Sequence, residues 1–177
     1  NESLYIPAER QIIPLMTQSA LSLINNKVPL ELFPKYILNF GEKFEEATVK
    51  INKFEIPFLQ ITYAKIEGKE FVLTNGQNPI SLSSSSSGIQ SLIPTLLVVE
   101  DSYSLLNKGH TFIIEEPELN LYPKTQKDLI YHLVDRCTRK DENHYNELVI
   151  TTHSPYVLAA FNNLLLAGKA NKKIANK

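Results

Sequence analysis

The chain has 177 residues, of which 43% are hydrophobic and 21% are charged, and its formal net charge is -1. This is the composition of a soluble globular protein with a core of its own, and the near-neutral charge gives no overall argument for binding nucleic acid. A single cysteine, Cys137, excludes an internal disulfide, and no apolar run approaches the length of a membrane span. Since no signal peptide opens the sequence, we expect a cytoplasmic protein without a membrane partner.

The first part of the chain alternates between helical and strand-like patterns. Residues 3–7 predict a short strand, residues 8–27 are partly helical in spacing, and a helix is expected through 42–53. Pro14 is expected to break any single long helix in the second of these segments. Residues 58–74 alternate polar and apolar side chains around a central glycine, which predicts a β-hairpin.

A serine tract, Ser83–Ser87, leads into the apolar run 88–99, which predicts a buried helix with Pro94 as a candidate for a bend. Hydroxyls, a glycine and free backbone N–H groups at a helix start are typical of an anion site, and Gly88 would let a phosphate approach closely. A serine-rich N-cap, an exposed loop or a flexible linker is the alternative interpretation.

Two strand-and-helix pairs follow. Residues 111–114 are short and apolar, as in a central parallel strand, and a helix is expected from Pro123 to about residue 138. A second strand at 148–152 is followed by a helix that begins near Pro155. This order predicts an α/β unit with a parallel sheet.

Carboxylates stand where the first of these strands ends. Glu115 and Glu116 come directly after it, and Glu118 follows one proline later. Open α/β sheets bind ligands at such strand ends, and in phosphoryl-transfer sites one acid holds Mg²⁺ while a neighbouring acid polarises the attacking water. The alternative is an acidic, solvated exit from the strand without a function.

A histidine, His153, ends the second strand. An imidazole at that position can hydrogen-bond a terminal phosphate, because it serves as donor or acceptor near neutral pH. A packing or capping histidine is the alternative interpretation. Ser154 is well suited to cap the following helix whatever the function.

In this order and spacing, the fragments resemble the signature motif, Walker B motif and switch histidine of ABC-type AAA ATPases related to SMC and OLD proteins. The matching stretches are Glu115–Glu118, Leu121–Pro123 and Thr152–Pro155. Tyr5–Arg10 also looks like a segment common in that group, so the resemblance covers about residues 3–166.

The resemblance implies an α/β fold of the P-loop NTPase type: a partial ABC ATPase head with a parallel sheet core, flanking helices, a helical lobe and a β-hairpin. We expect a single domain over residues 1–177. Its parts would be the helical lobe at about 30–57, the hairpin at 58–74, the signature motif and helix at 81–100, the core from Walker B to the switch histidine at 110–166, and a frayed basic tail at 167–177.

The resemblance also implies a role for each matching residue. Glu115 would hold Mg²⁺, Glu116 would be the catalytic base that orients water, and His153 would be the switch histidine. The residues that would contact ATP from the signature motif and the D-loop are Ser86, Ser87, Gly88, Gln90 and Asn120.

The sequence departs from the family pattern at three matched positions. Ser85 stands where the signature motif begins with leucine, and Ile89 replaces a residue that is usually polar. Tyr122 stands where a histidine is frequent.

The largest departure is a missing P-loop. No Gly-x-x-x-x-Gly-Lys-Ser/Thr sequence occurs, and Gly68-Lys69 lacks the first glycine and is followed by Glu70. Both ends read as those of a piece of a longer protein, so we expect no appreciable hydrolysis from this chain alone. The whole protein would hydrolyse ATP with Mg²⁺ in a head-to-head homodimer, with DNA-linked work such as repair, phage defence or an effector nuclease as its setting.

Two other functions remain open at this point. A head that has lost its P-loop would be a non-catalytic dimerisation or scaffold module. A metal hydrolase would use Glu115, Glu116, Glu118 and His153, although the sequence offers no compact His/Asp ligand set for it.

Overall fold

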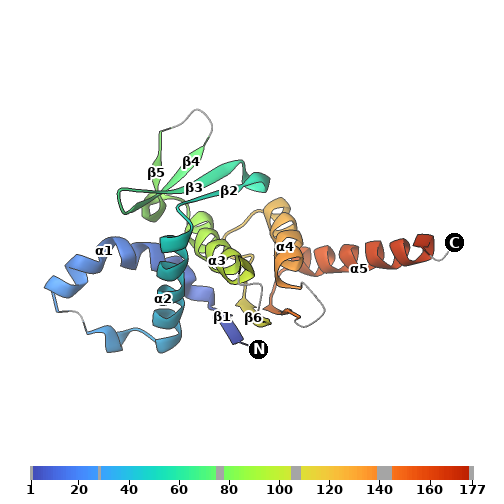
Figure 1. Ribbon diagram of the computed structural model, residues 1–177, viewed down its shortest axis with the longest axis horizontal. Helices are drawn as coiled ribbons and strands as arrows, with labels where there is room; N and C mark the ends of the chain where they lie inside the picture. Colours follow the sequence, from blue (N-terminus) through green and yellow to red (C-terminus); the bar gives the residue numbers. More distant parts are fainter. Residues whose placement is uncertain (1, 28, 75–77, 105–108, 139–144, 176–177) are drawn as a thin grey trace.

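Two β-sheets, with helices between and around them, organise the molecule (Figure 1). The computed structural model describes residues 2–27, 29–74, 78–104, 109–138 and 145–175. The fold is mixed α/β, with a parallel sheet, flanking helices and an antiparallel hairpin sheet, so the predicted fold class is confirmed.

The parallel sheet has the strand order β1-β6-β7. Its strands are β1 (Glu2–Ile6), β6 (His110–Glu115) and β7 (Glu147–Thr151). Ile6 pairs with Ile114, and Glu115 pairs with Thr151. Because the strands are parallel and in this register, β6 and β7 end side by side, and the segments that follow them leave the sheet at the same end.

The two faces of the parallel sheet differ in burial. Leu4, Ile6, Phe112 and Ile114 are at most 7% exposed and belong to the main hydrophobic core. On the β7 strand Val149 is 49% exposed. One face therefore packs on helices, and the other is open on the β7 side.

The antiparallel sheet has the order β2-β3-β4-β5. Its strands are β2 (Lys53–Ile56), β3 (Ile61–Ile66), β4 (Lys69–Thr74) and β5 (Ile80–Ser81). The predicted hairpin is formed by β3 and β4, and it turns at Gly68, where a φ of 78° suits a residue without a Cβ.

The helices of the first part differ in their bounds from the sequence prediction. A 3-10 turn, η1 (Ala8–Ile12), leads into α1 (Ile13–Asn25), so Pro14 lies in the first turn of α1 and starts it rather than breaking it. After the short η2 (Leu30–Leu32), α2 runs over Lys35–Lys50, which corrects the expected range of 42–53.

The long helix α3 (Ser87–Ser104) lies between the two sheets in Figure 1 and supplies much of the core. It begins at the serine tract, directly after the 3-10 turn η4 (Leu82–Ser84) that follows β5; a further 3-10 turn, η3 (Pro57–Leu59), joins β2 to β3. The helix continues through Pro94 as one element. Its fully buried apolar residues include Leu92, Ile93, Leu96, Leu97, Val98 and Val99.

Two further helices complete the fold. α4 (Pro123–Cys137) follows β6, and α5 (Pro155–Ala175) follows β7 and packs against α4 through Val157 and Ala160. The expected frayed tail from residue 167 is helical through Ala175. No proline interrupts this stretch, and adding a residue to an existing helix is far easier than starting one.

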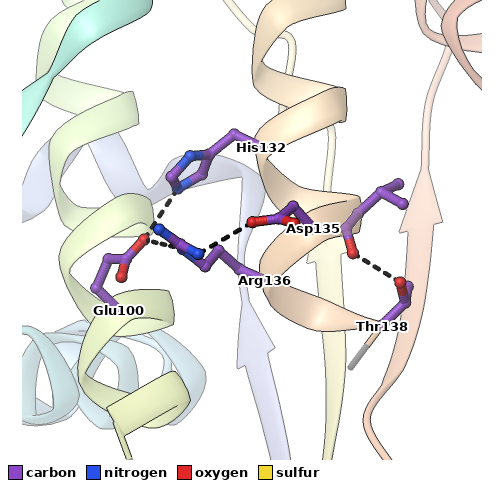
Figure 2. Close-up of polar contacts among 6 residues, drawn as sticks. Glu100, His132, Asp135, Arg136 and Thr138 are labelled. Carbon is purple, nitrogen blue, oxygen red and sulfur yellow. Dashed lines mark hydrogen bonds and ion pairs between the residues drawn. The ribbon is translucent and has the colours of Figure 1, made fainter. Parts of the chain in front are cut away.

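A polar cluster joins α3 to α4 (Figure 2). Glu100 Oε1 accepts a hydrogen bond from Arg136 Nε at 2.8 Å and lies 3.1 Å from His132 Nε2. The Arg136 guanidinium also lies over the Tyr103 ring, 4.8 Å from its centre. Burial opposes ionisation of Glu100, but His132 and Arg136 more than offset it, so the pKa of Glu100 lies below its ordinary value.

Among the described residues, none of the helices combines the length and the apolar character needed to cross a bilayer.

Candidate functional site

The segments after β6 and β7 bring an acid and an imidazole together. His153 Nε2 lies 3.2 Å from Glu116 Oε1, and the Glu116 N–H donates to Thr151 O at 3.0 Å. The His153 side chain is 94% exposed and that of Glu116 is 20% exposed. We call the ends of β6 and β7 and the segments that follow them, residues 115–122 and 151–154, the rim of the sheet. The rim thus carries a mostly buried carboxylate beside an exposed imidazole that can exchange partners with solvent or a ligand.

The Glu116 backbone has an unusual conformation. Its φ is 41°, in the left-handed region that residues with a Cβ rarely adopt. Strain of this kind persists only where the surroundings hold it. Besides the bond to Thr151, the Glu116 carbonyl accepts from the Leu119 N–H at 3.1 Å, so the loop closes back on itself directly after the strand.

A fully buried arginine lies behind this loop. Arg10 is 0% exposed and donates to Glu115 O at 2.7 Å, Glu116 O at 2.8 Å, Pro7 O at 2.9 Å and Ser91 O at 3.3 Å. Burial lowers its pKa to about 10, against the opposing effect of Glu118 and other nearby carboxylates, so the guanidinium stays charged at neutral pH.

Glu118 ties the two loops of the rim together. It is 6% exposed, and its Oε1 accepts from the Thr152 hydroxyl and from the backbone N–H groups of His153 and Ser154, each at 3.2 Å from the nitrogen. Its Oε2 is buried and has no hydrogen-bond partner among the residues that the structure describes. A carboxylate on the β6 loop therefore sets the path of the β7 loop, and with it the position of the imidazole.

The sequence alone assigns no positioning role to Arg10 or Glu118, although both lie within the motifs. The signals were present: a charged pair inside the Tyr5–Arg10 segment, and a third carboxylate just beyond Pro117. Neither signal shows that the side chain turns inward, because burial of a charge depends on partners distant in the chain.

Ser154 caps α5 and extends the network. Its Oγ accepts from the Tyr156 N–H at 3.2 Å, which confirms the predicted cap, and donates to Gln126 Oε1 at 2.5 Å. The Gln126 amide nitrogen donates in turn to Leu121 O at 2.8 Å. A chain of hydrogen bonds therefore links the loop before α4 to the segment that carries His153.

Glu115 and Glu116 have different surroundings, as expected for neighbouring acids at a strand end. The Tyr5 hydroxyl lies beside Glu115, and burial together with this carboxylate raises the pKa of Tyr5 to about 12. The Tyr5 ring meets that of Tyr36 edge-on, with the centres 5.9 Å apart. Glu115 thus has its partner on β1, whereas Glu116 has its partner on the β7 loop.

The serine–glycine segment packs on the loop before α4. Ser86 and Ser87 are exposed at the start of α3, while Gly88 is buried. A Cβ at Gly88 would lie 2.5 Å from Asn120 O, so only glycine allows this approach. Asn120 itself has a φ of 60° and donates from Nδ2 to Gln11 Oε1 at 3.1 Å.

Gln90, predicted to contact ATP, has a local bonding role in the structure. Its Nε2 donates to Ser83 O at 2.7 Å and to Ser85 O at 3.0 Å. The amide therefore holds the serine turn against the first turn of α3. Ser86 and Ser87, in contrast, are exposed residues at the start of α3.

The rim offers only a small number of side chains that could bind a metal ion. Within the part of the chain that the structure describes, no three His, Cys, Asp or Glu side chains are arranged to hold a metal ion. The metal-hydrolase alternative, which needs such a set, has no support from this geometry. One or two carboxylates at a strand end are nevertheless the usual protein share of a Mg²⁺ site completed by phosphate and water.

A known protein family matches this chain. A search among curated proteins finds no match. The family model described as AAA ATPase domain matches residues 6–158, a stretch that includes Arg10, both loops of the rim and the start of α3. Since the match covers most of the chain, the protein belongs to the AAA ATPase domain family.

Proposed function

We propose that this chain is the portion of an ABC-type, SMC/OLD-like ATPase head that carries the catalytic carboxylate and the switch histidine. The observation that carries the proposal is the 3.2 Å contact between Glu116 and His153 at the ends of neighbouring parallel strands. Such a rim is where open α/β sheets bind their ligands. The family match makes a nucleoside triphosphate the ligand of choice.

The two residues would divide the work of hydrolysis. Glu116, 20% exposed, would accept a hydrogen bond from the attacking water and orient it. His153, almost fully exposed, would leave Glu116 to donate to the terminal phosphate and return when that phosphate is lost. The contact between them is thus a resting arrangement whose partners can be exchanged.

Glu115 fits the role of the Mg²⁺ ligand by chemistry and position. It offers carboxylate oxygens, the donors that Mg²⁺ prefers, at the same strand end as Glu116. When bound, ATP would supply the transferable phosphoryl group, and Mg²⁺ would neutralise part of the negative charge of the phosphates.

A P-loop is required for tight binding of the phosphates, and the chain contains no such sequence. We therefore propose that another segment supplies it and that this chain alone does not hydrolyse ATP. β7 is an edge strand of the described parallel sheet, and Val149 on it is 49% exposed. A strand carrying a P-loop would pair with the open side of β7, which would place the P-loop next to His153.

A head-to-head homodimer is part of the proposal. Ser86 and Ser87 are exposed at the start of α3, and Gly88 fixes that start against Asn120. Hydroxyls and free N–H groups at a helix start suit the phosphates of a nucleotide held by a second copy. Repair of DNA, phage defence or control of an effector nuclease is the setting that the family likeness suggests.

A second candidate follows from the missing P-loop. The same chain could act as a non-catalytic dimerisation or scaffold module that keeps the rim and the α3 start but never turns over ATP. Under this alternative, copies associate through the α3 start, and Glu116 has no kinetic role.

The test is Glu116→Gln in a protein that joins this chain to its P-loop segment. We expect ATP turnover to fall at least about 100-fold, because a general base is lost, while ATP binding and dimerisation persist. Glu67→Gln, on the exposed hairpin turn, is the control. Turnover that is unchanged in Glu116→Gln rejects the base, and wild-type protein that dimerises without any turnover supports the scaffold.

A further inference from the structure

We propose that Arg10 is a positioning residue that sets the direction of the Glu116 carboxylate by holding both peptide groups that flank it. The role of Glu116 as base comes from the proposed function above, on which this catalytic consequence rests. The geometric part stands on the hydrogen bonds of the described residues alone.

The guanidinium reaches the two carbonyls that matter for this residue. Nη1 donates to Glu115 O at 2.7 Å and Nη2 donates to Glu116 O at 2.8 Å. One carbonyl belongs to the peptide group before the Glu116 Cα and the other to the peptide group after it. Any rotation about φ or ψ of Glu116 moves one carbonyl relative to the other, so a rigid planar fork bonded to both fixes both angles.

The strained backbone conformation of Glu116 requires contacts that keep it in place. Its φ of 41° is disfavoured for a residue with a Cβ, and glutamate offers no local side-chain bond that would favour it. The Thr151 carbonyl holds only the preceding peptide group, through the Glu116 N–H, and the Leu119 N–H holds only the following one, whereas Arg10 bonds to both. Relaxation to an ordinary negative φ would turn the side chain away from its position 3.2 Å from His153.

Arg10 is itself anchored, so it can transmit a fixed position. It is 0% exposed, and it also donates to Pro7 O at 2.9 Å and to Ser91 O at 3.3 Å. Ser91 lies on α3, one turn after Gly88. Arg10 therefore fixes the orientation of Glu116 relative to α3 and to the segment that directly follows β1.

Arg10→Lys separates this role from mere packing. An ammonium keeps the charge but cannot bond both carbonyls with a fixed fork. In the folded variant of this chain, we expect the Glu116 ¹³Cα and ¹³Cβ NMR shifts to leave their left-handed values. Ile93→Val, which trims a fully buried α3 side chain, is the matched control and should leave these shifts in place. Unchanged Glu116 shifts in Arg10→Lys overturn the proposal.

A second variant covers the case in which Arg10→Lys does not fold. Glycine adopts a positive φ without penalty, so adding Glu116→Gly should restore folding to Arg10→Lys by removing the backbone cost that Arg10 no longer offsets. A double variant that stays unfolded overturns the proposal.

Turnover tests the consequence in the protein that contains the P-loop. Arg10→Lys should lower kcat at least about 10-fold with little change in KM, because a misdirected base slows chemistry more than binding. Ile93→Val should keep its kcat. If wild type has no turnover, the proposed function fails and the NMR result still decides the role of Arg10. If wild type is active and Arg10→Lys keeps its kcat, the catalytic consequence is wrong.

Discussion

Two clusters of sheltered charge use their hydrogen bonds differently. At the rim, Arg10 and Glu118 bond mainly to backbone groups of the β6 and β7 loops. Between α3 and α4, Glu100 and Arg136 bond to each other, with His132 alongside (Figure 2). A charge bonded to backbone dictates the shape of a loop, whereas a side-chain pair links two helices that already have their shape.

The difference also affects what is lost when a charge is removed. Glu118 Oε1 accepts from two backbone N–H groups and the Thr152 hydroxyl, so its removal takes the acceptor from the His153 N–H and from that hydroxyl, while the Ser154 N–H keeps its 3.0 Å bond to Thr152 Oγ1. Glu100 is 14% exposed at its side chain, and Arg136 is 32% exposed, so water can replace much of what that pair provides. We therefore expect the rim to be the more sensitive cluster.

The largest effect expected in the comparison is that of Glu118→Ala. We expect it to lower the free energy of unfolding by about 3 kcal/mol, because buried donors lose their acceptor and Arg10 loses a neighbouring negative charge. Glu118→Gln keeps an acceptor oxygen and should cost less than half as much. Urea denaturation followed by circular dichroism measures both, and a loss for Glu118→Ala no greater than that for Glu100→Ala would remove the contrast between the clusters.

A smaller effect is expected from Glu100→Ala, about 1 kcal/mol at pH 7, as for a partly exposed ion pair. Its pH dependence sharpens the comparison. The folded-state pKa of Glu100 lies below its ordinary value, so its stabilisation is complete above that ordinary value and is lost as the pH falls through the folded-state pKa. The difference between wild type and variant should therefore shrink below about pH 4. A difference that grows with acidity would contradict this assignment.

Much of the rim could be predicted because its signals are local. Apolar runs ending in Glu115 and His153 predict strands, and parallel strands in register bring their ends to one edge. That topology places His153 and Glu116 at the same end of the sheet, where their side chains lie 3.2 Å apart. Gly88 was likewise singled out for close approach, although its partner in the structure is Asn120 O.

The supports of the rim could not be predicted in the same way. Arg10 bonds to a carbonyl 105 positions away in the sequence, and such a contact has no local pattern. The positive φ of Glu116 is equally hidden, because a glutamate does not mark a left-handed position as glycine or asparagine does. The ordered helix at the tail was missed because its weakly apolar, basic composition resembles that of a frayed end.

The most direct test of the central claim is a double-mutant cycle on Glu116 and His153 in the protein that contains the P-loop. Wild type, Glu116→Gln, His153→Ala and the double variant are compared by kcat at saturating Mg²⁺·ATP. If the two side chains act together at one site, each single variant is slow and the double variant is no more than about 3-fold slower than Glu116→Gln. Losses that multiply in the double variant, or a His153→Ala protein with wild-type kcat, would contradict the account.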